Sequence, residues 1–162
     1  MTTRSFGWVL VLALLAISAL PAGAQAQGSR LHAGKISGPP ATRQSFNCLE
    51  DAFTMCLNGG RFEVVAAFDA NTGASGDAKM VRLTNDSGYM WFFGSSNIEA
   101  VVKVINGCGV DNNYWFFAGG LTNVHTVITV TDSITGAGVQ YENPQNRPFQ
   151  PIQDTRALAV CP

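Results

Sequence analysis

The sequence predicts an all-β protein, an antiparallel two-sheet sandwich of immunoglobulin-like type with about seven strands and disulfide bonds. Hydrophobic residues make up 46% of the chain and charged residues 13%, and Gly reaches 17 and Phe 10, a composition typical of short strands joined by tight turns. Apolar runs recur between turn signals at intervals of about 8 to 15 residues, which leaves no room for the crossover helices of a parallel sheet. The 4 cysteines form an even set in a chain that carries an export signal.

Residues 1–26 have the features of a cleaved secretory signal peptide. Arg4 precedes an apolar run over residues 7–20, and small residues with two overlapping Ala-x-Ala sites follow. Cleavage is therefore expected before Gln25 or Gln27, and the mature protein is expected to be secreted or periplasmic, with no contact to the membrane. The alternative is an uncleaved membrane anchor, although the apolar run is shorter than the roughly 20 residues that span a bilayer.

The predicted domain covers residues 47–162, and residues 27–46 precede it. This preceding segment is rich in Gly, Pro and Ser and has neither a strand nor a helix period, which predicts a flexible N-terminal arm. At the start of the domain, the residues from Asn47 to Cys56 can form a short helical turn, with Asn47 as its cap.

The predicted strands follow the alternation of apolar residues and end at turn residues. The run 61–68 alternates loosely, and 124–131 alternates cleanly. The runs 89–93 and 114–118 are almost wholly aromatic or apolar, and turns that contain Gly close them. The full expected set is 61–68, 78–84, 89–93, 98–105, 114–118, 124–131 and 139–142. The proline-rich residues 143–162 cannot form a central strand, so an extended tail laid over the sandwich is expected.

The cysteines Cys48, Cys56, Cys108 and Cys161 are expected to form two disulfides. Zinc is the weaker alternative, because zinc sites favour cysteine pairs with two to four residues between the ligands, and no pair here is that close. If the first strands alternate in direction, the start of the first and the end of the fourth lie at one end of the sandwich. This predicts the pairs Cys56–Cys108 and Cys48–Cys161, although Cys48 and Cys56 could instead close a small loop of their own.

The sequence predicts no catalytic residue, no metal site and no cofactor. The net charge of −1 is spread along the chain, so no basic surface is available for nucleic acid. Ser87 lies in an Asp-Ser-Gly turn without a nucleophile elbow, and His125 is expected to be an ordinary strand residue. Asp69, Asn71 and Asp77 could form a loose calcium site, but a hairpin loop over 69–77 is the simpler interpretation.

The two aromatic strands carry more large apolar side chains than the interior of a sandwich accepts. Strand alternation exposes half of each strand, and in one pair of registers the exposed set is Met90, Phe92, Trp115 and Phe117. We take these residues as the candidate aromatic surface, because a bare patch of this size is unusual on a soluble monomer.

Three explanations for such a surface remain open. The C-terminal tail could cover the rings, with Phe149 among its apolar residues. The rings could form a surface for self-association or for a partner protein. They could also form a shelf for sugars, although apolar rings without clustered Asn, Asp or Gln suit sugars less well.

Strings along the chain resemble those of a recurrent β domain of secreted bacterial proteins. They are Cys56–Phe62 (CLNGGRF), Asp86–Phe93 (DSGYMWFF), Gly119–Val124 (GGLTNV) and Pro148–Thr155 (PFQPIQDT). The resemblance covers Cys48 to Cys161. That domain occurs alone or appended to larger exported proteins, including peptidases. The resemblance therefore implies a secreted β domain and assigns neither a reaction nor functional residues.

The function expected from these observations is that of a secreted, non-enzymatic accessory or binding module with a protein or carbohydrate partner. A secreted protease inhibitor is one alternative, in which the Gly-rich loop 71–76 would be the inhibitory tip. A small extracellular hydrolase is the other.

Overall fold

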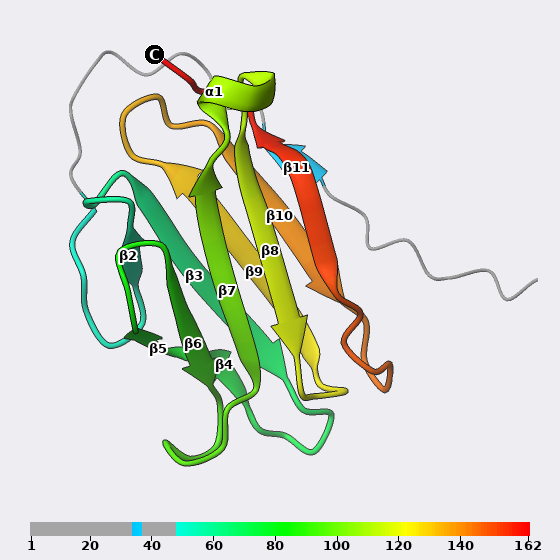
Figure 1. Ribbon diagram of the computed structural model, residues 1–162. Coiled ribbons are helices and arrows are strands. Elements are labelled where there is room, and N and C mark those ends of the chain that lie inside the picture. The colour runs from blue at the N-terminus through cyan, green and yellow to red at the C-terminus, as the bar shows by residue number, and fades with distance from the viewer. Residues whose placement is uncertain (1–33, 37–47) are drawn as a thin grey trace, which may run out of the picture.

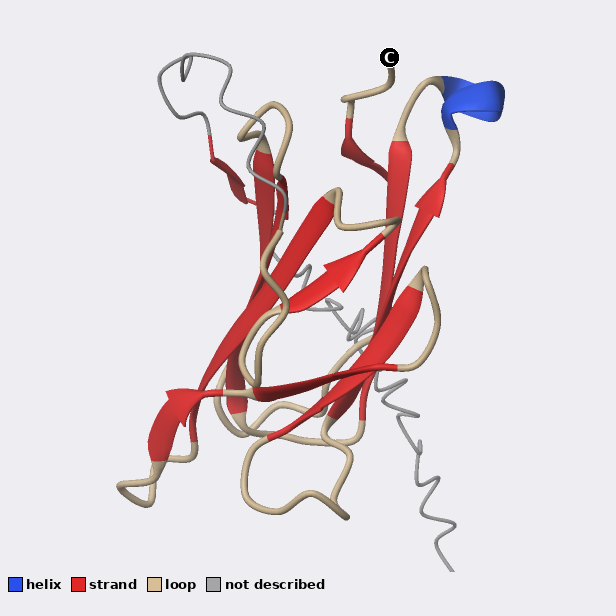
Figure 2. Cartoon of the chain, turned by 90° about the vertical axis from the view of Figure 1, so that its left-hand side faces the viewer, coloured by secondary structure: helices blue, strands red, loops and turns tan. Residues whose placement is uncertain are grey.

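The computed structural model describes residues 34–36 and 48–162, which form two antiparallel sheets packed face to face (Figure 1). The expected signal peptide, Asn47 and most of the expected arm lie outside the described residues. Within that arm, Gly34–Ile36 forms strand β1 and pairs with a strand of the domain. Figure 2 shows that the described chain is almost entirely strand and loop, with one short helix at the end of the molecule.

Sheet A is six-stranded and sheet B is five-stranded. Sheet A contains, in spatial order, β1 (Gly34–Ile36), β10 (Gly138–Asn143), β9 (His125–Asp132), β3 (Phe62–Asp69) and β2 (Met55–Leu57), and β4 (Ser75–Asp77) also pairs with β3. Sheet B contains β11 (Ile152–Leu158), β8 (Tyr114–Gly120), β7 (Ala100–Asn106), β6 (Ser87–Trp91) and β5 (Lys79–Arg82). Helix α1 (Cys108–Asp111) follows β7. The chain passes between the sheets from β4 to β5, from β8 to β9 and from β10 to β11, so each sheet mixes distant parts of the sequence.

Every strand that the sequence predicts is present, and the antiparallel sandwich is confirmed. The expected helical turn before Cys56 is wrong, because Met55–Leu57 forms β2 and pairs with the start of β3. The Asp51 carboxylate instead accepts hydrogen bonds from the backbone amides of Phe53 and Thr54, both at 2.8 Å. This local Asx turn offers the backbone an alternative to a helix.

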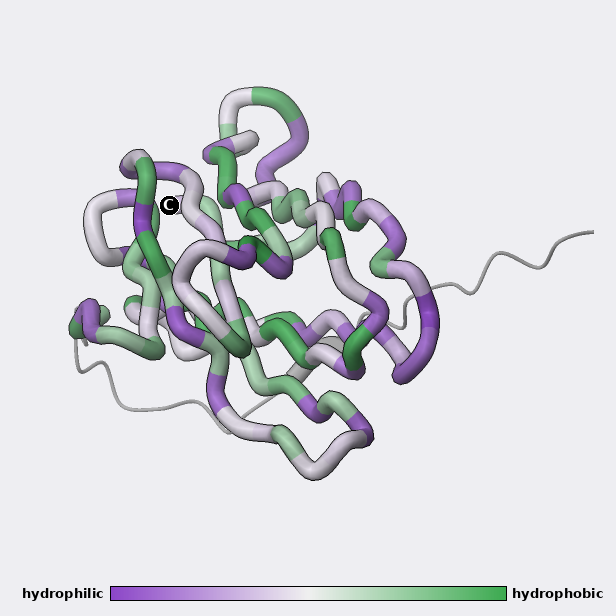
Figure 3. The backbone as a smooth tube through the Cα atoms, turned by 90° about the horizontal axis from the view of Figure 1, so that it is seen from below, coloured by the Kyte–Doolittle hydropathy of each residue, from purple (hydrophilic) through white to green (hydrophobic). Residues whose placement is uncertain are grey.

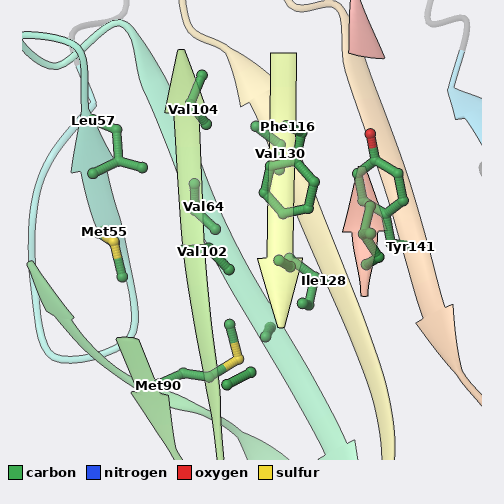
Figure 4. Packing of buried hydrophobic residues seen from close by; sticks show 14 of the residues in the cluster. Met55, Leu57, Val64, Met90, Val102, Val104, Phe116, Ile128, Val130 and Tyr141 are labelled. Atoms are coloured by element: carbon green, nitrogen blue, oxygen red, sulfur yellow. The ribbon is translucent and has the colours of Figure 1, made fainter. Parts of the chain in front are cut away.

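The core lies between the two sheets and is built from inward-facing residues of β2, β3 and β5 to β11 (Figure 4). Strand β9 buries Ile128 and Val130 completely, and β8 buries Phe116 against the ring of Tyr141 from β10, with ring centroids 4.6 Å apart. Burying a side chain of this size stabilises the fold by about 1.5–3 kcal/mol. The alternation seen in the sequence is therefore the alternation between core and surface.

The C-terminal segment is an edge strand of sheet B and not a tail laid over it. Strand β11 pairs with β8, and its Ile152 and Leu158 are buried. Pro148 and Pro151 precede the strand, where proline interrupts no ladder hydrogen bond. The proline density thus excluded a central strand, as expected, while permitting a strand at the edge.

All four cysteines form disulfides, but the expected pairing is wrong. The bonds are Cys48–Cys56, over a sequence separation of 8, and Cys108–Cys161, over a separation of 53. Cys56 lies in β2 of sheet A, whereas Cys108 follows β7 of sheet B, so the simple alternation of strands that would bring them together does not exist. Because β11 runs antiparallel to β8, it returns the chain to the end of β7, where the C-terminus lies beside α1 (Figure 1).

Candidate functional site

The outer faces of the two sheets differ sharply in chemistry. On sheet A, the outward positions of β3, β9 and β10 carry no Phe, Tyr or Trp and mix polar and small side chains with two valines, Val65 and Val127, as in the rows Glu63–Thr131 and Val65–Thr129–Gln140. On sheet B, the outward positions are mainly large and apolar. They are Tyr89, Trp91, Val101, Ile105, Trp115 and Phe117, which we call the aromatic face. This face is turned to the viewer in Figure 1.

The strand register places the rings of the aromatic face on a diagonal. Tyr89 is the partner of Val101, whereas Phe117 is the partner of Lys103, two residues further along β7. Trp115 lies further still and is the partner of Ile105. The rings of β6 and β8 therefore lie on either side of β7 and form a band across the sheet.

A shallow groove of about 360 Å³ crosses the middle of the aromatic face. Phe117, Pro151 and Leu83 line it, and Leu83 is 63% exposed. The groove exists because two positions in it carry little side chain, namely Gly119 on β8 and Ser87 on β6. Its size is at the lower end of the range for small-ligand sites, and it is open to the solvent along the sheet.

The indole of Trp115 is held in place from one side. Its Nε1 donates a hydrogen bond to the Asp111 carboxylate at 2.9 Å, and its ring meets Phe117 edge to face with centroids 6.4 Å apart. A Cβ on Gly107 would lie 2.3 Å from the indole nitrogen, so glycine at this position admits the ring. The half-buried rings thus present a fixed surface to the solvent.

The structure places two of the four predicted surface residues on the outside. Trp115 and Phe117 point outward and are half-buried, but Met90 is fully buried and Phe92 is 8% exposed, so the predicted register of that strand is wrong. Phe92 stacks on Phe68 with centroids 4.6 Å apart. Tyr89 and Trp91 take the outward positions instead.

Gly88 explains the register of β6. A Cβ at this position would lie 2.5 Å from the Met55 sulfur, so Gly88 faces the packed interior. Alternation then directs Met90 inward and Tyr89 outward. Gly88 is visible in the sequence as a glycine beside a turn. That it must face inward follows only from its contact with Met55 of β2, a strand that the sequence did not predict.

The charge in the middle of the aromatic face is positive, while the Asp111 carboxylate lies at its edge against Trp115. Lys103 is exposed in the middle of β7, between the partners Ser87 and Phe117. On the outward side of β6, β7 and β8 no carboxylate projects among the described residues. The middle of the aromatic face therefore combines apolar side chains with one exposed cation, Lys103.

The other candidate groups do not assemble into a reactive site. Ser87 belongs to sheet B and His125 to sheet A, and His125 Nε2 contacts the exposed carboxylate of Glu142 at 2.9 Å. The Asp69 carboxylate accepts a hydrogen bond from the backbone amide of Asn71 at 2.9 Å within the β3–β4 hairpin. The expected inhibitory tip, residues 71–76, covers most of the loop of this hairpin and the first two residues of β4. Within the described ranges, no group of three or more His, Cys, Asp or Glu side chains is placed to hold a metal ion.

In the described part of the chain, no helix has the length and apolar character needed to cross a bilayer.

Comparison with known proteins finds no family model, no curated protein and no solved structure that matches the chain.

Proposed function

We propose that this protein is a secreted, non-enzymatic interaction module that binds another exported protein through the aromatic face. The observation that supports it is the contrast between the two sheets, because the outside of sheet B carries Tyr, Trp and Phe rings while the outward positions of β3, β9 and β10 in sheet A carry none. Contiguous apolar surface of this kind marks interaction sites on soluble proteins. Aromatic residues also dominate the centres of protein interfaces.

A protein partner fits the face better than a sugar does. Aliphatic side chains surround the rings, with Val101 47% exposed and Leu83 63% exposed. Sugars need several polar groups beside the rings, and the polar side chains that line the groove are three, Ser87, Lys103 and Gln153 of β11, the strand partner of Phe117. Aliphatic and aromatic surface together is the composition of an interface core.

A second copy of the chain fits less well than a different protein. In a two-fold pairing centred on the groove, Lys103 would approach its own counterpart without a carboxylate between them. Like charges in a desolvated interface cost several kcal/mol. A partner with an acidic group among apolar side chains removes this cost.

Export is part of the same proposal. The two disulfides are typical of an oxidising compartment outside the cytoplasm, and residues 1–26 supply the export signal. The resemblance to a secreted bacterial β domain is consistent with this location.

The proposal is tested by capture from the exported proteins of the native host, with the disulfide-intact domain immobilised. The test variant carries Val101→Ser and Phe117→Ser, and the matched control carries Val65→Ser on the outside of sheet A. The captured protein is then purified, and its affinity for each form is measured. We expect the test variant to weaken binding at least 30-fold and the control to leave it unchanged. Equal affinity for both variants, or recovery of polysaccharide in place of protein, would contradict the proposal.

A further inference from the structure

A second hollow lies apart from the groove on sheet B, where the β6–β7 and β8–β9 loops meet the segment before β11. Its volume is about 570 Å³, within the range of ligand sites. Its lining includes Phe93, Asn97, Glu99, Asn123 and Phe149. Figure 3 views the molecule from this end, and hydrophobic and hydrophilic stretches alternate along the loops.

The carboxylate of Glu99 is buried in this hollow. Glu99 is 4% exposed, and it is the one charged residue among those that line the hollow. One oxygen accepts a hydrogen bond from the side-chain amide of Asn97. Among the described residues, neither a salt bridge nor a second side-chain donor reaches this carboxylate. A carboxylate can accept several hydrogen bonds, so most of its capacity is unused.

The backbone around Glu99 is fixed by hydrogen bonds on both sides. Its amide donates to the Met90 carbonyl at 2.9 Å, and its carbonyl accepts from the amide of Leu121 at 2.7 Å. On the opposite side of the hollow, the backbone amide of Phe149 donates a hydrogen bond to the Thr122 carbonyl at 2.9 Å, which joins the segment before β11 to the β8–β9 loop. The hollow is therefore already formed in the free protein.

The rim of the hollow is apolar. Phe93 is 53% exposed, and its ring packs edge to face on Phe92 and Phe68, with centroids 6.0 and 5.5 Å apart. Leu121 is 82% exposed on the other side. A ligand that enters the hollow passes apolar surface first and meets the carboxylate inside.

We propose that this hollow binds a cationic group, an alkylammonium or a guanidinium, carried on an aliphatic stem. Among the described residues, no side-chain oxygen is both fully buried and without a hydrogen-bond partner, so the second oxygen of Glu99 is not sealed inside the protein. A ligand cation in the hollow would pair with this carboxylate, which the surrounding protein largely shields from water. The exposed ring of Phe93 favours a cation near its face, and the aliphatic stem would pack on Leu121 and Phe149. A neutral ligand of the same shape would leave the charge of Glu99 uncompensated. The cation can come from a lysine or arginine side chain of a protein or from a free amine.

The test is a titration of the isotope-labelled domain, followed by backbone amide NMR. The probes are N-acetyl-arginine methylamide, its neutral citrulline analogue and agmatine as a free amine. We expect saturable shifts at the amides of Phe93, Glu99 and Leu121 with the two cations, and binding at least tenfold weaker with the citrulline analogue. An arginine-containing pentapeptide that binds at least tenfold more tightly than agmatine identifies a protein side chain as the source. Equal affinities of the pentapeptide and agmatine identify a free amine as the source. Either outcome supports the cation site.

Glu99→Gln tests the charge itself and should weaken cation binding at least tenfold. Glu142→Gln is the matched control, because it makes the same change at an exposed carboxylate on sheet A, and it should have no effect. If Glu99→Gln fails to fold, Phe93→Ala provides a second test, because Phe93 is half exposed and its replacement should leave the fold intact. Phe93→Ala should weaken cation binding about threefold. Equal shifts with the cation and with citrulline, no saturable shift at all, or unchanged affinity in the folded Glu99 or Phe93 variant would overturn the proposal.

Discussion

The guanidinium of Arg61 donates a hydrogen bond from Nε to the fully buried carboxylate of Asp132, with 2.9 Å between Nε and Oδ1. Thr135 donates to the other oxygen of Asp132 at 2.7 Å, and Arg61 also donates to the Tyr114 hydroxyl at 3.0 Å and to the carbonyl of Val160. Hydrogen bonding to Asp132 raises the pKa of Arg61 above its usual value. The network joins the start of β3, the end of β9, β8 and the C-terminal segment.

Asp132→Ala should lower the free energy of unfolding by about 3–5 kcal/mol, because it leaves the largely buried guanidinium of Arg61 without its partner. Urea denaturation followed by intrinsic fluorescence measures the loss. Glu142→Ala is the control, since it breaks only the exposed contact with His125 and should cost less than about 0.5 kcal/mol. A similar cost for the two variants would show that the buried network does not hold the sheets together.

Removing the two disulfides should have unequal effects. The bond Cys108–Cys161 closes a loop over 53 residues, and the chain-entropy model gives it roughly 4 kcal/mol. The bond Cys48–Cys56 closes a loop over 8 residues and should contribute roughly 2.5 kcal/mol. Urea denaturation of the two double Cys→Ser variants measures the difference. If removal of Cys48–Cys56 lowers the free energy of unfolding more than removal of Cys108–Cys161 does, the prediction that Cys108–Cys161 contributes more stability is wrong.

Tyr141 should make stability fall at alkaline pH. Burial, followed by the nearby charge of Asp154 and the hydrogen bond to it, raises the pKa of the Tyr141 hydroxyl far above its ordinary value. The folded protein therefore favours the neutral phenol. Its contribution to stability is fully present below the unfolded-state pKa of about 10 and is lost as the pH rises above that value.

The measurement is the melting temperature between pH 8 and pH 11, together with absorbance at 295 nm. We expect Tyr141→Phe to flatten the alkaline decrease in stability, while Tyr89→Phe, on the outward side of β6, leaves it unchanged. In the wild type, phenolate absorbance from Tyr141 should appear only as the protein unfolds. Ionisation of all three tyrosines in the folded protein would contradict this prediction.

Phe149→Ala should destabilise the domain by about 3 kcal/mol, because Phe149 is 7% exposed and belongs to the core. Its ring lies where a Cβ on Gly120 would be, 2.3 Å from the Phe149 Cγ, so the ring fills the space that glycine leaves. Leu121→Ala, at an 82% exposed position, is the control and should cost less than about 0.5 kcal/mol. A melting temperature that Phe149→Ala does not lower would show that the segment before β11 is dispensable.

The sequence predicted the sandwich because strand alternation and turn residues are local signals. Strand β9 shows this well, since Thr126, Ile128 and Val130 face inward in the predicted alternation, although the strand extends one residue further, to Asp132, than the sequence predicts. The short strand β2 and the edge strand β11 were missed for a different reason. Both are defined by pairing with distant segments, β3 and β8, and their own residues carry little periodicity.

The wrong disulfide pairing and the wrong register at Met90 have the same origin. The position of Cys161 depends on β11, and the inward direction of Gly88 depends on Met55 of β2. The burial of Glu99 could not have been predicted either, because the sequence places it in the expected strand 98–105, whereas β7 begins at Ala100, and because carboxylates are almost never fully buried without a partner. An excess of rings was visible in the sequence, whereas the side of sheet B that presents them was decided by tertiary packing.

The most direct test of the aromatic face as the binding surface is photo-crosslinking in the native host. The photoreactive amino acid p-benzoylphenylalanine replaces Phe117 on the face in one strain and Thr129 on the outside of sheet A in another. We predict that irradiation links position 117 to a different exported protein and leaves position 129 without an adduct. An adduct with a second copy of this chain, equal adducts at both positions, or none at position 117 would contradict the claim.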